Sequence, residues 1–358
     1  MSRIDEPNYA HTKPPLHRMT TAIPLAPPHS DALRSEDAFL ALIGRCFPNS
    51  HHRLLLGRGD DCAVIDCRES LCVSSDLFLE DAHFRMAYFA PEDIGYKALA
   101  VNISDIGAMG AKPLGFVLNL MAPKHLERGF WEAFFHGMAE LAAEHDLYLA
   151  GGDLSDAPYL GIAVTIWGER PEGGKFLRRV QARPGDVLFL VGKVGLARLG
   201  LALLERGLGK TAEISMSVTP EDCPAAIQAH LRPALHPAVA TSLSRTDWVR
   251  GLMDVSDGLA RDLPRFLGTG LGCSLTLDPE TLHPELRLFA RENGVDAAEW
   301  AVLGGEDYAL LGVVAARDWD VLREKIPAVW RLGDVTAKPG IHLNGKQMRS
   351  RGFDHFSR

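Results

Sequence analysis

The stretch YKALAVNISDIGAMGAKP, residues 96–113, consists almost entirely of apolar and small residues. The spacing of its apolar residues predicts a helix from about residue 91 to residue 110. The apolar run LGFVLNLM at residues 114–121 follows directly and is typical of a buried strand. A helix joined so closely to a buried strand indicates helices packed in layers on a sheet, which is the α/β class.

Asp105 lies within the apolar pattern of this predicted helix. A stripe of residues at helical spacing runs from Ala98 to Met109. Asn102 and Asp105 interrupt this stripe with polar groups. Because a buried lone carboxylate is costly to ionise, we expect Asp105 to face a cation. Two ordinary interpretations stay open here, in which Asp105 caps a loop or pairs with Lys97.

Helices and strands continue to alternate outward from this stretch. The other segments with helical or strand patterns span residues 35–47, 71–79, 124–145, 147–150, 160–168, 186–192, 195–206, 237–246, 252–259 and 300–314. A segment rich in glycine, proline and charge at residues 168–186 indicates a connection between two domains. The chain is therefore predicted to be an α/β (α+β) protein with a flexible arm at 1–35, an N-terminal domain at 36–170 and a C-terminal domain at 171–358.

Composition limits the classes of partner. The 358 residues are 46% hydrophobic and 23% charged, which is typical of a globular protein. A net charge of -8 opposes binding to nucleic acid and to anionic membranes. No apolar run approaches the roughly 20 residues of a membrane-spanning helix, and the N-terminus lacks the apolar core of a secretory signal. We therefore expect a soluble cytoplasmic protein with no nucleic-acid or membrane partner.

Cysteine and histidine spacing predicts neither disulfides nor a zinc site. The six cysteines include no CxxC pair, so reduced and mostly buried thiols are expected. The fourteen histidines are scattered and include no HExxH motif. The adjacent His51 and His52 are interpreted as part of a polar loop.

Acidic residues recur after apolar runs, often beside glycine. They are Asp60, Asp61, Asp76, Asp153, Asp254, Asp257 and Glu306. Each taken alone fits an ordinary turn or helix cap. One oxygen-rich site would explain most of them together, since Mg²⁺ prefers carboxylates and substrate phosphates. The six carboxylates assigned to this site are Asp61, Asp76, Asp105, Asp153, Asp254 and Asp257. Such a site indicates phosphoryl transfer supported by metal ions and positioning.

The segment Gly209-Lys210-Thr211 imitates the end of a P-loop. The motif requires a glycine where this chain has Leu204, and a strand where it has a predicted helix. The prediction is therefore a protein that binds ATP without a P-loop.

Seven segments together resemble the thiamine-monophosphate kinase family. They are GRGDDCAVI, SSDLFLEDAHF, YKALAVNISDIGAMGAKP, LAGGD, DVSDGLARDL, VLGGEDYALL and GFDHF. Their order and spacing match the family from about residue 37 to residue 356. The family is related to aminoimidazole ribonucleotide synthetase and selenophosphate synthetase. The resemblance implies a two-domain fold like that of aminoimidazole ribonucleotide synthetase, and a homodimer formed through the N-terminal domain.

The resemblance also implies a reaction and a set of site residues. The reaction is direct in-line transfer of the γ-phosphoryl group of ATP to thiamine monophosphate, yielding thiamine diphosphate and ADP with several Mg²⁺ ions. The implied metal ligands are Asp61, Ser74, Ser75, Asp76, Asp105, Asp153, Asp254 and Asp257, of which Asp105, Asp254 and Asp257 are also implied to be catalytic. The implied nucleotide contacts are Gly152, Asp153, Arg179 and Ser256. The implied substrate contacts are His83, Glu306 and Phe353.

These implied roles suit the chemistry of the side chains. Arg179 supplies donors for phosphate, Glu306 supplies an acceptor for a cationic heterocycle or its amine, and Phe353 supplies a stacking face. The chain departs from the family pattern after LAGGD, where LSDAP replaces TTRGP and Asp156 stands in the place of an arginine. Alternative functions at this stage are an ATP-dependent synthetase, a non-catalytic nucleotide or thiamine-phosphate sensor, and a metal-dependent phosphatase.

Overall fold

The computed structural model describes residues 35–59, 62–67, 70–208 and 217–348. Four features of the sequence analysis lie outside these residues. They are residues 1–34 of the predicted arm, the pair Asp60 and Asp61, the P-loop-like segment that begins at Gly209, and Phe353 with its GFDHF motif.

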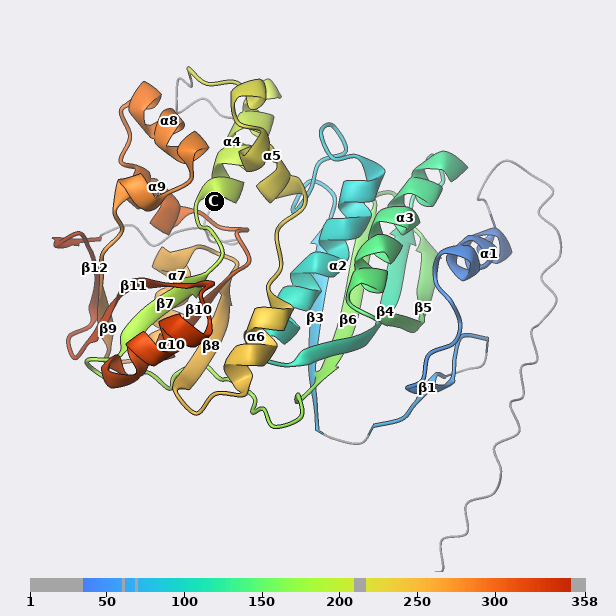
Figure 1. The fold of residues 1–358 in the computed structure, drawn as a ribbon. Helices are drawn as coiled ribbons and strands as arrows, with labels where there is room; N and C mark the ends of the chain where they lie inside the picture. Colours follow the sequence, from blue (N-terminus) through green and yellow to red (C-terminus); the bar gives the residue numbers. More distant parts are fainter. Residues whose placement is uncertain (1–34, 60–61, 68–69, 209–216, 349–358) are drawn as a thin grey trace, which may run out of the picture.

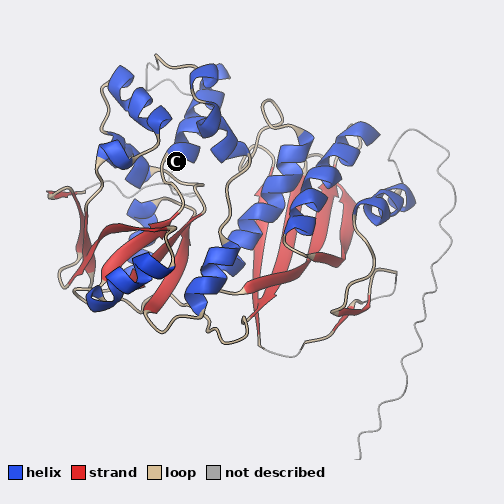
Figure 2. Ribbon diagram, viewed as in Figure 1, coloured by secondary structure: helices blue, strands red, loops and turns tan. Residues whose placement is uncertain are grey.

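The N-terminal half is a four-stranded sheet with helices on one face (Figures 1 and 2). Its strand order is β3 (Leu71–Leu79), β6 (Gly161–Glu169), β4 (Lys112–Ala122) and β5 (Tyr148–Asp156). The pair β4–β5 is parallel, whereas β3–β6 and β4–β6 are antiparallel. The covering helices are α1 (Glu36–Cys46), α2 (Pro91–Ala108) and α3 (Arg128–Glu144). A short hairpin of β1 (Leu54–Leu56) and β2 (Val64–Ile65) packs near Tyr148 and Trp167 on the other face.

Two glycines allow α2 and α3 to pack closely. A Cβ atom on Gly95 would lie 2.0 Å from the carbonyl oxygen of Phe134, and one on Gly137 would lie 2.1 Å from that of Glu92. Each helix thus presents a glycine to the backbone of the other. This contact fixes α2 between α3, the sheet and the C-terminal half, and 13 of its 18 residues are buried.

The C-terminal half contains a seven-stranded sheet. Its order is β13 (Lys346–Gln347), β12 (Gly340–Leu343), β9 (Gly272–Leu275), β11 (Val329–Thr336), β7 (Val187–Val191), β10 (Ala309–Val314) and β8 (Val249–Val255). The helices are α4 (Leu196–Gly207), α5 (Pro224–Leu231), α6 (Pro237–Ser244), α7 (Leu259–Leu267), α8 (Pro284–Asn293), α9 (Ala297–Leu303) and α10 (Trp319–Lys325). Three single 3₁₀ turns span Pro220–Asp222, Pro279–Thr281 and Ala316–Asp318. Separate apolar cores occupy the two faces of this sheet.

The mixed α/β class predicted from the sequence is confirmed. The predicted strand at 71–79 coincides with β3, and Ser35 caps α1 as its position predicts, accepting a hydrogen bond from the Ala38 amide. Helices α5, α8 and α10 and strand β9 were not predicted. The segment 170–186 contains no described helix or strand, but the domain boundary at 170/171 stays a prediction. Within the described residues, no helix is long and apolar enough to cross a membrane.

Candidate active site

Helix α2 presents polar groups from one stripe toward the C-terminal half. Lys97, Val101, Ser104 and Asp105 recur at i, i+4, i+7 and i+8, which places them on one face. Lys97 and Ser104 are buried. Asn102 lies on the same stripe as Asp105, but it is buried and does not line the cavity, and its side-chain amide donates to the Ala98 carbonyl at 3.0 Å.

Strand β3 brings two polar side chains to this stripe. Ser74 Oγ hydrogen-bonds to Asp105 Oδ2. Asp76 is two residues further along the same strand and projects on the same side. Burial, and then the negative charge of Asp105, raise the pKa of Asp76 to about 6.

Strand β8 supplies a third carboxylate from the other half of the molecule. Asp254, near the end of β8, is only 2% exposed. Its Oδ2 accepts a hydrogen bond of 3.0 Å from Ser104 Oγ on α2. Burial, and then the charge of Asp105, raise the pKa of Asp254 to about 7. The two halves thus meet at carboxylates that repel one another.

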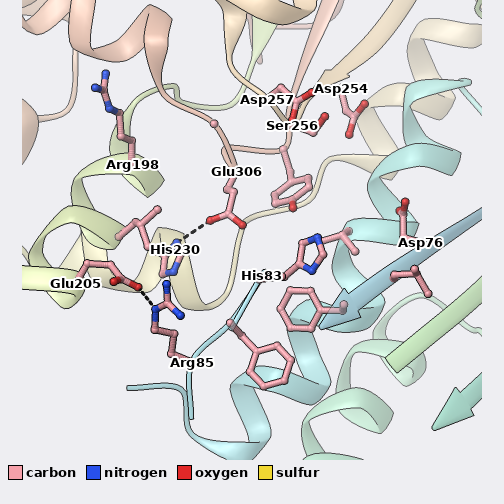
Figure 3. Close-up of a pocket in the computed structure, with 18 of the residues that line it drawn as sticks. Asp76, His83, Arg85, Arg198, Glu205, His230, Asp254, Ser256, Asp257 and Glu306 are labelled. Atoms are coloured by element: carbon pink, nitrogen blue, oxygen red, sulfur yellow. Dashed lines mark hydrogen bonds and ion pairs between the residues drawn. The ribbon is translucent and has the colours of Figure 1, made fainter. Parts of the chain in front are cut away.

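These groups line one cavity of about 660 Å³ between the two halves (Figure 3). This volume is in the usual range for small-molecule sites. The predicted site residues that line it are Asp76, His83, Asp105, Asp254, Ser256, Asp257 and Glu306. Apolar and aromatic side chains, including Phe78, Phe84, Tyr88 and Val101, form much of the remaining wall. The cavity therefore combines an acidic region with surfaces on which rings can pack.

Two predicted ligands project from the opposite face of the N-terminal sheet. Ser75 Oγ lies 2.8 Å from the Thr165 hydroxyl and does not meet Asp105. Asp153 pairs with Asn119 across β4–β5 and is exposed. Neither residue lines the cavity. Their roles as metal ligands stay predictions.

Two predicted nucleotide contacts, Gly152 and Arg179, are not among the residues that line the cavity. A Cβ atom at Gly152 would lie 1.8 Å from the Leu118 carbonyl oxygen, so only glycine fits where β5 approaches β4. The exposed Arg179 is close enough to Asp254 for its positive charge to oppose the rise in the pKa of that carboxyl.

Asp257 is paired with protein cations. Its Oδ2 lies 2.5 Å from Arg265 Nη1 and 3.4 Å from Arg261 Nε. It lines the cavity, but its charge is offset more fully than that of Asp76 or Asp254. Its assignment as a metal ligand stays a prediction.

The loop between α9 and β10 places Glu306 against two basic residues. Oε2 of Glu306 lies 3.3 Å from Lys97 Nζ and 3.0 Å from His230 Nδ1. Burial would raise the pKa of Glu306, but Lys97 and His230 outweigh burial and lower it to about 2. Lys97 therefore pairs with Glu306, and not with Asp105 as one interpretation of the sequence allowed.

Asp307 binds another element than Glu306 does, whereas Tyr308 lines the same cavity as Glu306. The carboxylate of Asp307 accepts the amides of Gly195, at 2.7 Å, and Ala197, at 3.2 Å, at the start of α4. Burial nevertheless raises the pKa of Asp307 to about 8. Glu306 and Tyr308 have positive φ angles, 63° and 49°, which turn successive side chains toward different elements.

Sequence reasoning missed several residues of this site. Lys97 and Ser104 share the α2 stripe with Asp105, so their helical spacing was a usable signal. His230 and Glu205 carried no such signal, since their partners are distant in the chain. Arg85 Nε lies 2.5 Å from Glu205 Oε1 across the two halves, near the cavity.

One histidine cluster lies far from this cavity. His51, His52 and Asp146 have potential ligand atoms within 4.8 Å of one another, the only such group of three in the described parts of the chain. The Arg53 amide donates to His51 Nδ1 at 3.2 Å, so a neutral ring carries its proton on Nε2, which lies 3.6 Å from Asp146. Nε2 has no hydrogen-bond partner among the described residues, and the interpretation of His51 and His52 as part of a polar loop stays a prediction.

Family models match both halves of the chain. Residues 59–169 match the AIR synthase related protein, N-terminal domain, and residues 183–346 match the corresponding C-terminal domain. The thiamine-monophosphate kinase of Bacillus subtilis (strain 168) is 34% identical over 331 residues, covering 86% of this chain and 95% of the relative. The chain belongs to the thiamine-monophosphate kinase family.

Solved thiamine-monophosphate kinases share the fold. The enzyme from Stenotrophomonas maltophilia K279a superposes with a TM-score of 0.70 at 30% identity, covering 87% of this chain and 96% of that one. AaThiL complexed with AMPPCP and TMP gives a TM-score of 0.69 at 29% identity, covering 90% and 97%. These findings confirm the family resemblance and the aminoimidazole ribonucleotide synthetase-like fold expected from the sequence.

Proposed function

We propose that this protein, as a member of the thiamine-monophosphate kinase family, transfers the γ-phosphoryl group of ATP to thiamine monophosphate. An oxygen of the acceptor phosphate forms the new bond to phosphorus while the bond to the ADP oxygen breaks, so the products are thiamine diphosphate and ADP. The observation that carries this proposal is the convergence of Asp76, Asp105 and Asp254 from both halves on one cavity. That cavity also offers apolar and aromatic walls for two heterocycles.

The acidic region of the cavity, formed by Asp76, Asp105 and Asp254, fits Mg²⁺. Asp76 and Asp254 have raised pKa values because of burial and Asp105, so their ionised forms require positive charge that protein cations do not fully provide. The side-chain atoms that contact Asp105 and Asp254 are hydroxyl oxygens of Ser74 and Ser104, and oxygens are the ligands that Mg²⁺ prefers. Asp76, Asp105 and Asp254 would hold the ions, with Asp61 and Asp153 as further sequence-derived candidates. Bound Mg²⁺ would neutralise phosphate charge as it shifts during transfer.

The protein's own groups position the reactants. Ser74 and Ser104 hydrogen-bond to Asp105 and Asp254 and thereby fix the directions of these carboxylates. A phosphate acceptor is already an anion, so the reaction needs no general base. We therefore assign catalysis to positioning and electrostatics rather than to a protein nucleophile.

The direct test is incubation of the purified protein with ATP, Mg²⁺ and thiamine monophosphate. Formation of thiamine diphosphate and ADP in equal amounts is expected, and EDTA should abolish it. Free phosphate as the main product would instead indicate a phosphatase. Absence of product at every Mg²⁺ concentration would refute the proposed function.

We also propose a homodimer formed through the face of the N-terminal sheet that no helix covers. Val73 and Leu77 on the edge strand β3 are 63% and 56% exposed, which is unusual for large apolar side chains on one strand. Val73→Glu should shift the mass measured by light scattering from dimer to monomer. Val321→Glu, on the surface of α10, serves as the control. The cytoplasmic location and the lack of a nucleic-acid partner stay predictions.

A further inference from the structure

The loop between β3 and α2 forms one wall of the cavity. The loop residues that line the cavity are Ala82, His83, Phe84, Arg85 and Tyr88. Phe84 and Phe89 are buried, and their ring centres lie 5.0 Å and 6.5 Å from that of Phe78 on β3. This aromatic packing anchors the loop, residues 80–90, in the core of the N-terminal half.

Glu205 of α4 binds the same loop from the C-terminal half, as Figure 3 shows for its contact with Arg85. Its Oε1 lies 2.5 Å from Arg85 Nε and accepts a hydrogen bond of 2.8 Å from the Tyr88 hydroxyl. Burial, and then the hydrogen bond to Glu205, raise the pKa of Tyr88 to about 13, so this hydroxyl keeps its proton. Arg85 Nη1 also donates to Asp81 Oδ1 at 2.9 Å. One carboxylate oxygen thus binds two loop residues across the boundary between the halves.

Position 205 is an unfavourable place for a carboxylate that lacks a compensating cation. Glu205 is buried, as are Leu199 and Leu203 of the same helix. It also lies in the last turn of α4, where the helix dipole disfavours negative charge. A buried ion pair adds little net stability over well-packed apolar side chains. The contribution of the pair with Arg85 is therefore the geometry that it imposes on the 80–90 loop.

This contact lies away from the acidic region. Figure 3 shows Arg85 and Glu205 at one end of the cavity, and Asp76 and Asp254 on the opposite side of the same view. In the proposed function, Mg²⁺ and the phosphates occupy the acidic region. The predicted nucleotide contact Ser256 lies beside Asp254. The 80–90 loop therefore lines the part of the cavity that is left for the organic portion of the acceptor.

We propose that Glu205 is a positioning residue that holds the 80–90 loop against α4 through Arg85 and Tyr88, and thereby shapes the wall that binds the acceptor. This inference rests on the proposed function. His83 follows the loop backbone, because its Nδ1 accepts the Leu79 amide at 3.1 Å. Loss of Glu205 leaves the aromatic anchor of the loop in place, so the protein folds but the wall becomes more mobile. Acceptor binding then weakens, whereas the acidic region is unchanged.

Steady-state kinetics of Glu205 variants provide the first test. Glu205→Leu should raise the KM for thiamine monophosphate roughly 10-fold and leave kcat and the KM for ATP within about 2-fold of wild type. Glu205→Gln retains an oxygen acceptor and should raise the same KM by only about 3-fold. An unchanged KM in folded Glu205→Leu, or an equal rise in both KM values, would overturn the inference. Inactive wild-type protein would refute the proposed function itself.

The partner residue and a matched pair elsewhere sharpen this test. Arg85→Gln acts on the same contact, so its combination with Glu205→Leu should raise the KM for thiamine monophosphate no more than about 2-fold above the larger single effect. Multiplied effects would overturn the inference. If Glu205→Leu does not fold, Arg85→Gln decides the matter by the same KM values. Glu280→Leu is the control, because Glu280 Oε2 also lies 2.5 Å from an arginine, Arg287, but is 79% exposed.

Hydrogen exchange of the full chain without substrates tests the positioning independently of the reaction. The amides of Tyr88 and Phe89 donate to the Arg85 carbonyl at 3.2 Å and 3.0 Å. Glu205→Leu should increase the exchange rate of a peptide covering residues 80–90 roughly 10-fold, while the rate over β4 stays at the wild-type value. An unchanged rate over the loop would overturn the inference and leave the proposed function intact.

Discussion

Asp254 and Glu306 are carboxylates in the wall of the same cavity, but their surroundings differ. Asp254 meets Ser104 and the repelling charge of Asp105, and its pKa rises to about 7. Glu306 meets Lys97 and His230, and its pKa falls to about 2. The acidic region therefore depends on ligands from solution to balance its negative charge. In the Glu306 cluster, which consists of Glu306, Lys97 and His230, the protein itself balances the negative charge.

The largest expected effect follows from removal of a charge in the acidic region. Asp105→Asn or Asp254→Asn should lower kcat for thiamine diphosphate formation by roughly 10²- to 10³-fold, as is typical when one electrostatic contact of a transition state is lost. Asp320→Asn, at an 85% exposed position on α10, is the control and should retain full activity. Full activity in either cavity variant would show that the carboxylate does not serve the reaction.

Removal of the Glu306 charge should mainly affect stability. Glu306→Gln leaves the buried Lys97 ammonium without its ion-pair partner, so the free energy of unfolding should fall by about 3 kcal/mol. Urea denaturation measures this change, and Glu324→Gln on the surface of α10 is the control. A change below about 0.5 kcal/mol would mean that Lys97 is already neutral in the folded protein.

The pairing of Glu306 with Lys97 also predicts that the difference in the free energy of unfolding between wild type and Glu306→Gln depends on pH. The folded pKa of Glu306, about 2, is below its ordinary value of 4.5, so ionisation favours the folded state. The contribution is complete above about pH 4.5 and is lost as the pH falls toward 2. Unfolding curves should show a constant difference between pH 8 and 5.5 and a shrinking one below 4.5. A difference that grows in acid would contradict the assigned pairing.

The smallest expected effect is a gain in stability, whereas Glu306→Gln is expected to lose stability. Without divalent cations at pH 8, Asp254→Asn removes a buried charge that repels Asp105, so the variant should be more stable than wild type by about 1 kcal/mol. Mg²⁺ should then stabilise wild type more than the variant. Thermal unfolding with and without Mg²⁺ measures both changes. Destabilisation of the metal-free variant would mean that the Ser104 contact outweighs the repulsion.

The acidic region was easier to predict from the sequence than the Glu306 cluster. Asp76, Asp105 and Asp254 each interrupt or end an apolar run, and such patterns survive in a single sequence because burial imposes them locally. His230 lies in the short helix α5, which has little amphipathic pattern, so no local signal marks it. The elements show the same division: β3 was predicted within its observed bounds, whereas the short helices α5 and α8 were missed.

Faces of elements were harder to predict than their existence. The α2 helix is buried on several sides, so its apolar pattern does not distinguish the face toward the sheet from the face toward Asp254. Asn102 and Asp105 therefore share one predicted stripe, although only Asp105 lines the cavity. A bulge between β4 and β5 similarly shifts the register before Asp153, and no turn or glycine signal alone determines which face of the sheet that residue occupies.

Lys97 also constrains how the molecule can move. Its ammonium extends from the N-terminal half and is held by the His230 carbonyl and the Glu306 carboxylate, both of which belong to the C-terminal half. Swinging the halves apart would strip a buried cation of both partners, at a cost of several kcal/mol. This buried contact therefore opposes any separation of the two halves at α2.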